Sequence, residues 1–149
     1  MAEFRLSNFT SGAVLTAAEL NTGLTYATYT PVWVQGTKTI THTKNWAQYT
    51  QFGKFVSGSV KLTSTTAGST TSAIHQVTLP VNASTNNDVL GSGFVHDTVA
   101  PAYFPLITVL LNATNVQFIQ TDVTVASYLT RNINVSAWVL RFNFMYEAA

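Results

Sequence analysis

The strongest constraint on the fold is a stretch of strict alternation in the middle of the chain. From Lys54 to Thr63, alternate positions are apolar or glycine, and most positions between them are polar. The first set comprises Val56, Gly58, Val60 and Leu62. A period of two over this length is typical of a half-buried β-strand, because a helix would repeat near 3.6 residues. Gly53 precedes this strand and is the predicted hinge of a hairpin with the segment before it.

The closing segment, Asn134 to Glu147, shows the second clear alternation. Its large apolar side chains occupy every other position, at Trp138, Leu140, Phe142, Phe144 and Tyr146. Aromatic side chains bury large apolar areas, so a row of them on one face of a strand favours burial of that face. We therefore expect this strand to form much of the core.

Turn residues divide the rest of the chain into further short segments. Strands are expected at 28–35, 37–43, 46–52, 73–81, 89–97, 103–111 and 116–121. The segment 28–35 is expected at a sheet edge because it contains Pro31, and 37–43 is expected to be a polar, exposed ribbon. Gly91 and Gly93 predict a bend or bulge. Many short strands with regular turn signals predict an all-β fold, an antiparallel β-sandwich of jelly-roll type.

Residues 1–27 differ from the predicted sandwich domain at 28–149. Thr16 and Glu19 have the spacing of a capping box, and Gly23 is a stop signal, so one or two helical turns are expected between them. The segment is too apolar for a free tail, with Phe4, Leu6, Phe9, Val14, Leu15 and Leu20. Because so short a helix is marginal alone, we expect these residues to be a docking arm.

Composition excludes several classes of function. The chain is 46% hydrophobic but only 9% charged, and its net charge of +1 comes from scattered basic residues, which disfavours nucleic-acid binding through phosphates. It has no cysteine, no secretory leader pattern and no apolar run of membrane-spanning length, so we expect no membrane insertion and synthesis in a cytoplasm. A surface so poor in charge favours a subunit that is covered by partners.

The chain shows no pattern of reactive groups. Its acidic residues are far apart, its histidines (His42, His75, His96) fall on different expected strands, and no G-x-S-x-G motif occurs. His75 shares the parity of apolar neighbours and is expected in the core with a hydrogen-bond partner. For His96 and Asp97, a solvated turn is favoured over a cation or glycan contact. We predict no catalytic, metal-binding or cofactor-binding residue, and no enzyme.

The aromatic residues at strand spacing are expected mainly in the core. This set comprises Trp46, Tyr49, Phe52, Trp138, Phe142 and Phe144. Phe55 is an exception because it falls on the polar parity of its strand, and Tyr103 is a second candidate for exposure. Each is either an inter-subunit contact or a platform for a sugar ring. The low charge of the chain favours the interface.

An ordered set of short motifs runs along most of the chain: LTAAELN, YTPVWV, WAQYTQFGKFV, VTLPV, GSGFVHD and WVLRFNFMYEAA. Together they resemble small β-sandwich modules of tailed bacteriophages, particularly those that infect actinobacteria, over residues 16–149. Such modules occur as end domains of minor tail proteins and fibres, and as free-standing virion appendages. The resemblance implies a homotrimer.

We expect no fibre shaft before the predicted arm, which favours an accessory subunit placed directly on the particle. The resemblance therefore implies a structural protein of the virion surface, of the capsid-decoration or head-fibre type, that contacts the major capsid protein or another virion protein. The alternative is a tail-tip or fibre-knob protein that binds a host cell-surface carbohydrate. A cellular carbohydrate-binding module and an enzyme are the remaining alternatives.

Overall fold

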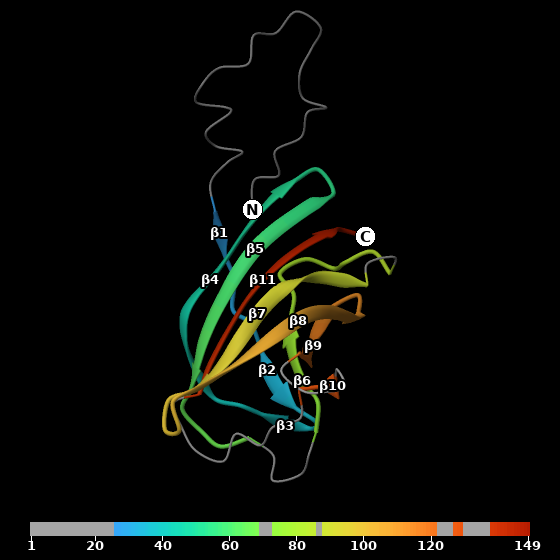
Figure 1. Ribbon diagram of the computed structural model, residues 1–149. Coiled ribbons are helices and arrows are strands. Elements are labelled where there is room, and N and C mark those ends of the chain that lie inside the picture. The colour runs from blue at the N-terminus through green and yellow to red at the C-terminus, as the bar shows by residue number, and fades with distance from the viewer. Residues whose placement is uncertain (1–25, 69–72, 86–87, 122–126, 130–137) are drawn as a thin grey trace, which may run out of the picture.

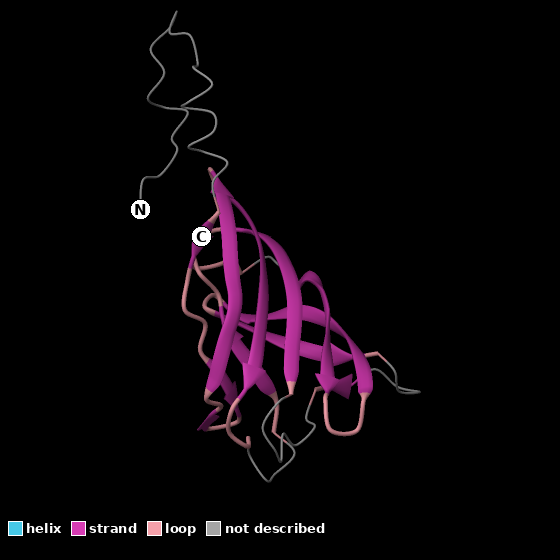
Figure 2. Cartoon of the chain, turned by 90° about the vertical axis from the view of Figure 1, so that its left-hand side faces the viewer, coloured by secondary structure: helices cyan, strands magenta, loops and turns pink. Residues whose placement is uncertain are grey.

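The computed structural model describes residues 26–68, 73–85, 88–121, 127–129 and 138–149. All regular structure in these residues is β-strand, as Figures 1 and 2 show. The strands are β1 (Ala27–Thr28), β2 (Trp33–Gln35), β3 (Lys38–Thr39), β4 (His42–Phe52), β5 (Phe55–Ser64), β6 (His75–Thr78), β7 (Val89–Asp97), β8 (Ala102–Asn112), β9 (Asn115–Gln120), β10 (Ser127–Tyr128) and β11 (Val139–Glu147). The predicted all-β class is confirmed. The predicted helical turns lie outside the described residues.

The strands form one antiparallel sheet that curls into a half-barrel (Figure 1). Its order is β1-β4-β5-β11-β7-β8-β9-β6-β2-β3, and β10 pairs with β9. The strand predicted at 28–35 is two separate strands, β1 and β2, with Pro31 between them. Proline lacks the N–H that a continuous ladder would need, which fits the break between them. Of the two strands, only β1 lies at an edge of the sheet.

A short link joins the two ends of the curled sheet. The chain passes from β3, at one end, through Ile40 and Thr41 into β4, near the other end. The backbone N–H of Ile40 donates to Trp33 (2.8 Å), and the carbonyl oxygen of Thr41 accepts from the N–H of Thr65 (2.8 Å). Ile40 is fully buried, so the prediction of an exposed ribbon at 37–43 is wrong at this residue. Its side chain enters the interior at the corner, while its neighbours stay exposed.

The core fills the concave face of the sheet. The predicted aromatic row of the closing segment is buried throughout, as are Val56, Val60 and Leu62. Phe118 of β9 meets Phe142 of β11 edge to face, with ring centroids 5.0 Å apart. These strands are not neighbours in the sheet, so their contact packs one wall against the other.

Gly58 makes room for this core at the centre of the β4–β5–β11 wall. It lies opposite Phe144 on one side and Tyr49 on the other. A Cβ atom at Gly58 would lie 2.5 Å from both the Phe144 ring and the carbonyl oxygen of Gln48. The missing side chain therefore lets the Phe144 ring lie over the strand.

Several buried polar side chains are hydrogen-bonded, and three buried polar atoms, on Tyr29, Thr108 and Trp138, have no partner among the described residues. Trp33 donates its indole N–H to Nδ1 of His75 (3.1 Å), and His75 is buried, which confirms its prediction. Tyr146 donates its hydroxyl to the carbonyl oxygen of Val81 (2.7 Å). The hydroxyl of Tyr29 has no hydrogen-bond partner among the described residues. Burial raises the pKa of both phenols, Tyr29 and Tyr146, above their ordinary value.

The predicted turns occur where expected. Gly53 has a φ of 57° in the two-residue turn between Phe52 and Phe55, a conformation that glycine adopts readily. The β7–β8 register shifts between Val89 and Gly91, which confirms the predicted irregularity in that strand. The turn between β8 and β9 is held by the side chain of Asn112, which accepts from the N–H of Thr114 (3.0 Å).

Candidate functional site

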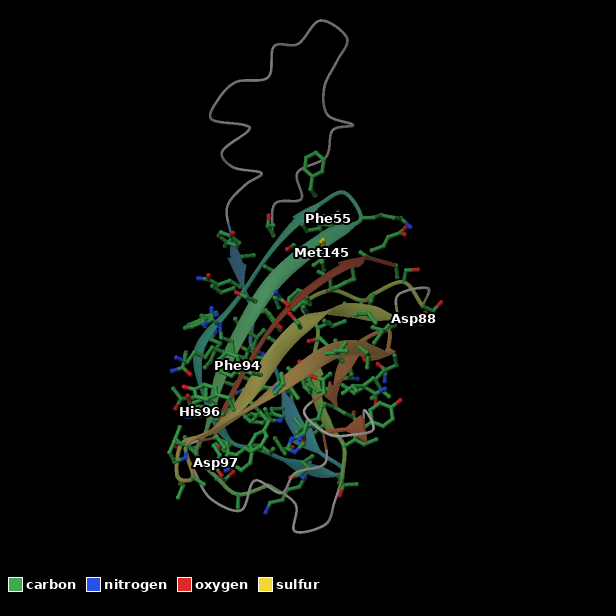
Figure 3. The ribbon with its side chains drawn as sticks, in the orientation of Figure 1. Phe55, Asp88, Phe94, His96, Asp97 and Met145 are labelled. Carbon is green, nitrogen blue, oxygen red and sulfur yellow. The ribbon has the colours of Figure 1, made fainter. Side chains whose placement is uncertain are left out.

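Phe55 and Tyr103, the two predicted contact residues, are both exposed but belong to different places. Phe55 is 47% exposed and Tyr103 is 64% exposed. Tyr103 pairs with His96 on β7, and His96 pairs with Val139 on β11. Val139 in turn pairs with Thr63, at the opposite end of β5 from Phe55. That separation is roughly 25 Å along the strand. Figure 3 shows Phe55 and His96 toward opposite ends of the sheet, so the structure does not join the two residues in one site.

The predicted docking arm cannot be placed in this arrangement. Its residues, Phe4, Leu6, Phe9, Val14, Leu15 and Leu20, lie outside the described part of the chain. The described residues contain no group of three or more histidines, cysteines or carboxylates that could hold a metal ion. In the same residues, no helix is long and apolar enough to cross a membrane.

A line of side chains crosses the convex face of the sheet, which we call the outer face. Trp46 of β4 pairs with Lys61 of β5, Lys61 pairs with Arg141 of β11, and Arg141 pairs with Phe94 of β7. The neighbours of these residues along each strand face the core, for example Val60 and Leu140. Side chains directly opposite each other on neighbouring strands are about 5 Å apart and interact. This line, the outer row, is the first component of the site.

The cations of the outer row gather at one indole ring. The ammonium nitrogen of Lys61 lies 5.0 Å from the centre of the Trp46 ring, and the guanidinium carbon of Arg141 lies 5.3 Å from it. Each cation–π contact of this kind contributes about 0.5–1 kcal/mol at an exposed site. Neither cation forms an ion pair with a described residue. Two like charges on directly paired residues repel each other, and both cations contact the same ring.

The described acidic residues either have other partners or lie far from Lys61 and Arg141. Glu147 lies 3.9 Å from the ammonium of Lys54 at the end of β11. Asp97 accepts from the N–H groups of Val99 (2.9 Å) and Ala100 (3.2 Å) through Oδ1, which makes it a turn residue as predicted. Asp88 precedes β7 and lies across the sheet from His96 in Figure 3. The outer row is therefore positively charged without a local counter-ion among these carboxylates.

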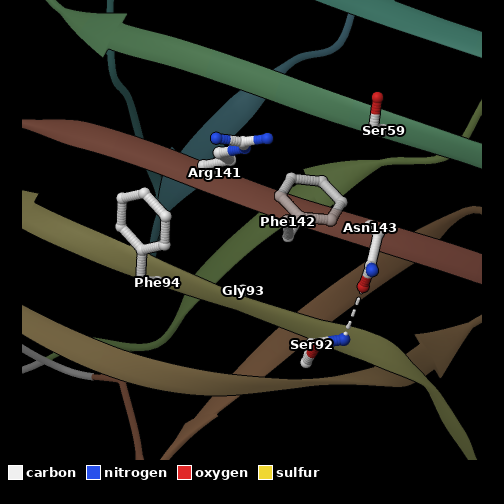
Figure 4. A pocket seen from close by; sticks show the side chains of 7 residues that line it. All are labelled: Ser59, Ser92, Gly93, Phe94, Arg141, Phe142 and Asn143. Carbon is white, nitrogen blue, oxygen red and sulfur yellow. Dashed lines mark hydrogen bonds between the residues drawn. The ribbon is translucent and has the colours of Figure 1, made fainter.

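A pocket of about 380 Å³ opens beside the outer row (Figure 4). Its lining residues come from β5, β11 and β7: Ser59, Ser92, Gly93, Phe94, Arg141, Phe142 and Asn143. The backbone N–H of Ser92 donates to Oδ1 of Asn143 (2.8 Å), which fixes the orientation of that amide. A Cβ atom at Gly93 would collide with the backbone of Arg141 and Phe142. The glycine therefore lets β7 lie close against β11 beneath the pocket.

Aromatic rings flank the pocket at the end that holds β7 and β8. Phe94 and Tyr103 meet edge to face with centroids 5.5 Å apart, and His96 stacks on Tyr103 at 4.1 Å with an interplanar angle of 2°. His96 thus contributes a ring contact in addition to preceding the Asp97 turn. The pocket combines one cation, hydroxyls and an amide with flat apolar rings.

A second feature of the outer face lies at the end of the β4–β5 hairpin. Phe52 and Phe55 are directly paired and each is 47% exposed, and Met145 on β11 is 55% exposed. Figure 3 shows Phe55 and Met145 near the same end of the sheet. We call these three residues the tip patch.

Strand parity could have revealed part of this surface. Trp46, Tyr49 and Phe52 are spaced by three residues, so alternation places Tyr49 on the face opposite to the other two. Tyr49 is buried, Phe52 is exposed, and Trp46 lies on the outer face. The prediction of a core position is therefore wrong for Trp46 and Phe52. The pairing of Lys61 with Arg141 depends on strand order, for which no local pattern exists.

Comparison of the chain with protein-family models, with curated proteins and with solved structures finds no match.

Proposed function

We propose that this protein is a structural subunit of a tailed-bacteriophage virion, of the capsid-decoration or head-fibre type, that assembles as a homotrimer. The observation that carries the proposal is the tip patch, in which Phe52, Phe55 and Met145 expose apolar surface at the end of a two-stranded hairpin. Exposed apolar surface of this kind is typical of sites that contact other proteins. The motif resemblance and the low charge of the chain point to the same role.

In this proposal, the arm at 1–27 and the tip patch bind the shell or a neighbouring copy, and the sheet faces outward. We further propose that the curled sheet is a sandwich of jelly-roll type. The ring contact between Phe118 and Phe142 supports this, because it joins two walls face to face. In a trimer, neighbouring copies would cover the open edges at β1 and β3, which removes sites of unwanted strand pairing.

The test is co-sedimentation of the purified chain with phage particles that lack it. We expect Phe52→Ser/Phe55→Ser to weaken binding at least about tenfold, because each buried phenylalanine contributes about 1.5–3 kcal/mol. Deletion of residues 1–24 should abolish binding and leave a folded sheet. Val99→Ser is the matched control, because Val99 is an exposed apolar residue away from the tip patch.

Full particle binding by both the deletion and the double variant would refute shell docking through these elements. Size-exclusion chromatography with light scattering tests the trimer separately. Electron microscopy of intact particles would then locate the copies on the head or on the tail.

The second candidate function is a tail-tip or fibre-knob protein that binds a host cell-surface carbohydrate. Tyr103 favours it, because this 64% exposed ring is held by stacking on His96 and could support a sugar ring. A glycan array with the purified chain tests this role. A hit that Tyr103→Ala abolishes would support it, and a blank array would contradict it.

A further inference from the structure

We propose that the pocket beside Arg141 is a binding site for a carboxylated saccharide, such as a uronate- or sialate-bearing chain. The inference is independent of shell docking. It narrows the second candidate function to one class of carbohydrate and assigns the contact to residues other than Phe55. Three properties of the outer face carry it: positive charge without a counter-ion among the described residues, a donor and acceptor set, and flat apolar rings.

The charge comes first. Lys61 and Arg141 are directly paired across β5 and β11, and neither is in an ion pair with a described residue. Like charges in this position repel each other, so an anion bound near Arg141 is attracted by both cations. The planar guanidinium of Arg141 matches a carboxylate through two parallel hydrogen bonds. Arg141 also lines the pocket, so a ligand bound there lies beside its side chain.

The polar groups fit a sugar better than a bare anion. Ser59 and Ser92 place hydroxyls on the pocket wall, and the Asn143 amide is oriented by the N–H of Ser92 (Figure 4). Hydroxyl and amide groups of this kind can both donate to and accept from the hydroxyls of a pyranose. The pocket volume of about 380 Å³ lies within the usual range for small-molecule sites.

The rings complete the match. Phe94 lines the pocket, and Tyr103 packs against it with 64% of its surface exposed. Flat apolar rings suit the C–H face of a sugar. A nucleic acid fits less well, because the net charge of the whole chain is only +1 and phosphate binding needs several cations along a backbone.

The experiment titrates the full-length chain by calorimetry with two matched pairs of probes. One pair is a galacturonic acid trisaccharide and its methyl ester, and the other is 3′-sialyllactose and neutral lactose. We expect the carboxylated probes to bind at least about tenfold more tightly than their neutral partners. Added salt should weaken the binding, because the charges are exposed.

Variants locate the binding. Arg141→Gln should weaken the affinity for the carboxylated probes at least about tenfold. Arg141→Lys should keep only part of the wild-type affinity, because lysine keeps the charge but lacks the planar guanidinium. Lys38→Gln is the control, since it removes an exposed cation on β3 without touching the pocket. Circular dichroism and a melting curve confirm that each variant is folded.

Trp46 supplies an internal reporter. Trp33 and Trp138 are buried at 0% and 5% exposure, whereas Trp46 lies on the outer face beneath both cations. A ligand bound to Arg141 should change the fluorescence of the wild-type chain, and the change should vanish in Trp46→Phe.

Three results would overturn the inference: no binding of either carboxylated probe at millimolar concentration, equal binding of the neutral partners, or binding unaffected by Arg141→Gln. Equal binding of neutral sugars that Tyr103→Ala abolishes would leave the second candidate function standing and refute the carboxylate site alone. Particle binding is measured separately, so its failure does not bear on this site.

Discussion

Two tyrosines that pack in the core, Tyr29 and Tyr146, differ in the hydrogen bonding of their hydroxyl groups. The hydroxyl of Tyr146 donates to Val81, whereas the hydroxyl of Tyr29 is buried without a described partner. A net hydrogen bond stabilises a protein by about 1 kcal/mol, and an unpaired buried polar group costs about 1–3 kcal/mol. The two phenols should therefore respond in opposite directions to loss of the oxygen.

We expect Tyr29→Phe to raise the free energy of unfolding by about 1 kcal/mol, and Tyr146→Phe to lower it by about the same amount. Urea denaturation at pH 7 measures both. The two substitutions remove the same atom from the same residue type, so each is the control for the other. A loss of stability in Tyr29→Phe would show that its hydroxyl has a favourable partner.

At the scale of the strand, the central wall depends on a residue without a side chain. Gly58 pairs with Tyr49 and Phe144, and a Cβ atom at Gly58 would lie 2.5 Å from both the carbonyl oxygen of Gln48 and the Phe144 ring. The carbonyl oxygen of Gln48 belongs to the backbone of β4, so it can move only if the ladder moves.

Gly58→Ala should destabilise the protein by about 2 kcal/mol, within the usual range for overpacking a core. Thermal unfolding followed by circular dichroism measures the change. Ser57→Ala on the same strand is the control, because Ser57 is only partly buried, and it should shift stability by less than about 0.5 kcal/mol. Adding Phe144→Leu should relieve only the ring contact and restore part of the loss. Unchanged stability in Gly58→Ala would contradict the crowding expected at this position.

Local alternation predicted the elements well, because burial on one face imposes a period of two. It correctly placed Val60, Phe142 and His75 in the interior and Phe55 outside it. Ile40 was missed because a single apolar residue at a corner forms no periodic pattern. The candidate site was missed for a different reason. Lys61 and Arg141 become neighbours only through the order of the strands in the sheet. They lie far apart in the sequence, so local alternation does not predict their pairing.

At the scale of the whole molecule, the buried phenols make stability depend on pH in the alkaline range. Burial raises the pKa of Tyr29, Tyr49 and Tyr146 in the folded protein. In the unfolded chain each phenol ionises near a pKa of about 10. The raised folded-state pKa means that the contribution to stability is fully present below pH of about 10 and is lost as the pH rises above it.

We expect the free energy of unfolding to fall above pH of about 10, by up to about 1.4 kcal/mol per pH unit for each such tyrosine. Urea titrations between pH 8 and pH 11, roughly the span over which the unfolded phenol ionises, measure the slope. The double variant Tyr29→Phe/Tyr146→Phe should show a shallower fall than the wild type. The same slope in both proteins would contradict this origin of the pH dependence.

The position of β11 in the sheet also determines the order in which the protein can be made. β11 pairs with β5 on one side and with β7 on the other, yet it follows both of them in the chain. Until the ribosome has released residues 139–147, the β4–β5 hairpin and the β7–β8–β9 meander each have an open edge. Folding must therefore be completed after synthesis of this strand, and a nascent chain that stalls before it presents two edges for aggregation.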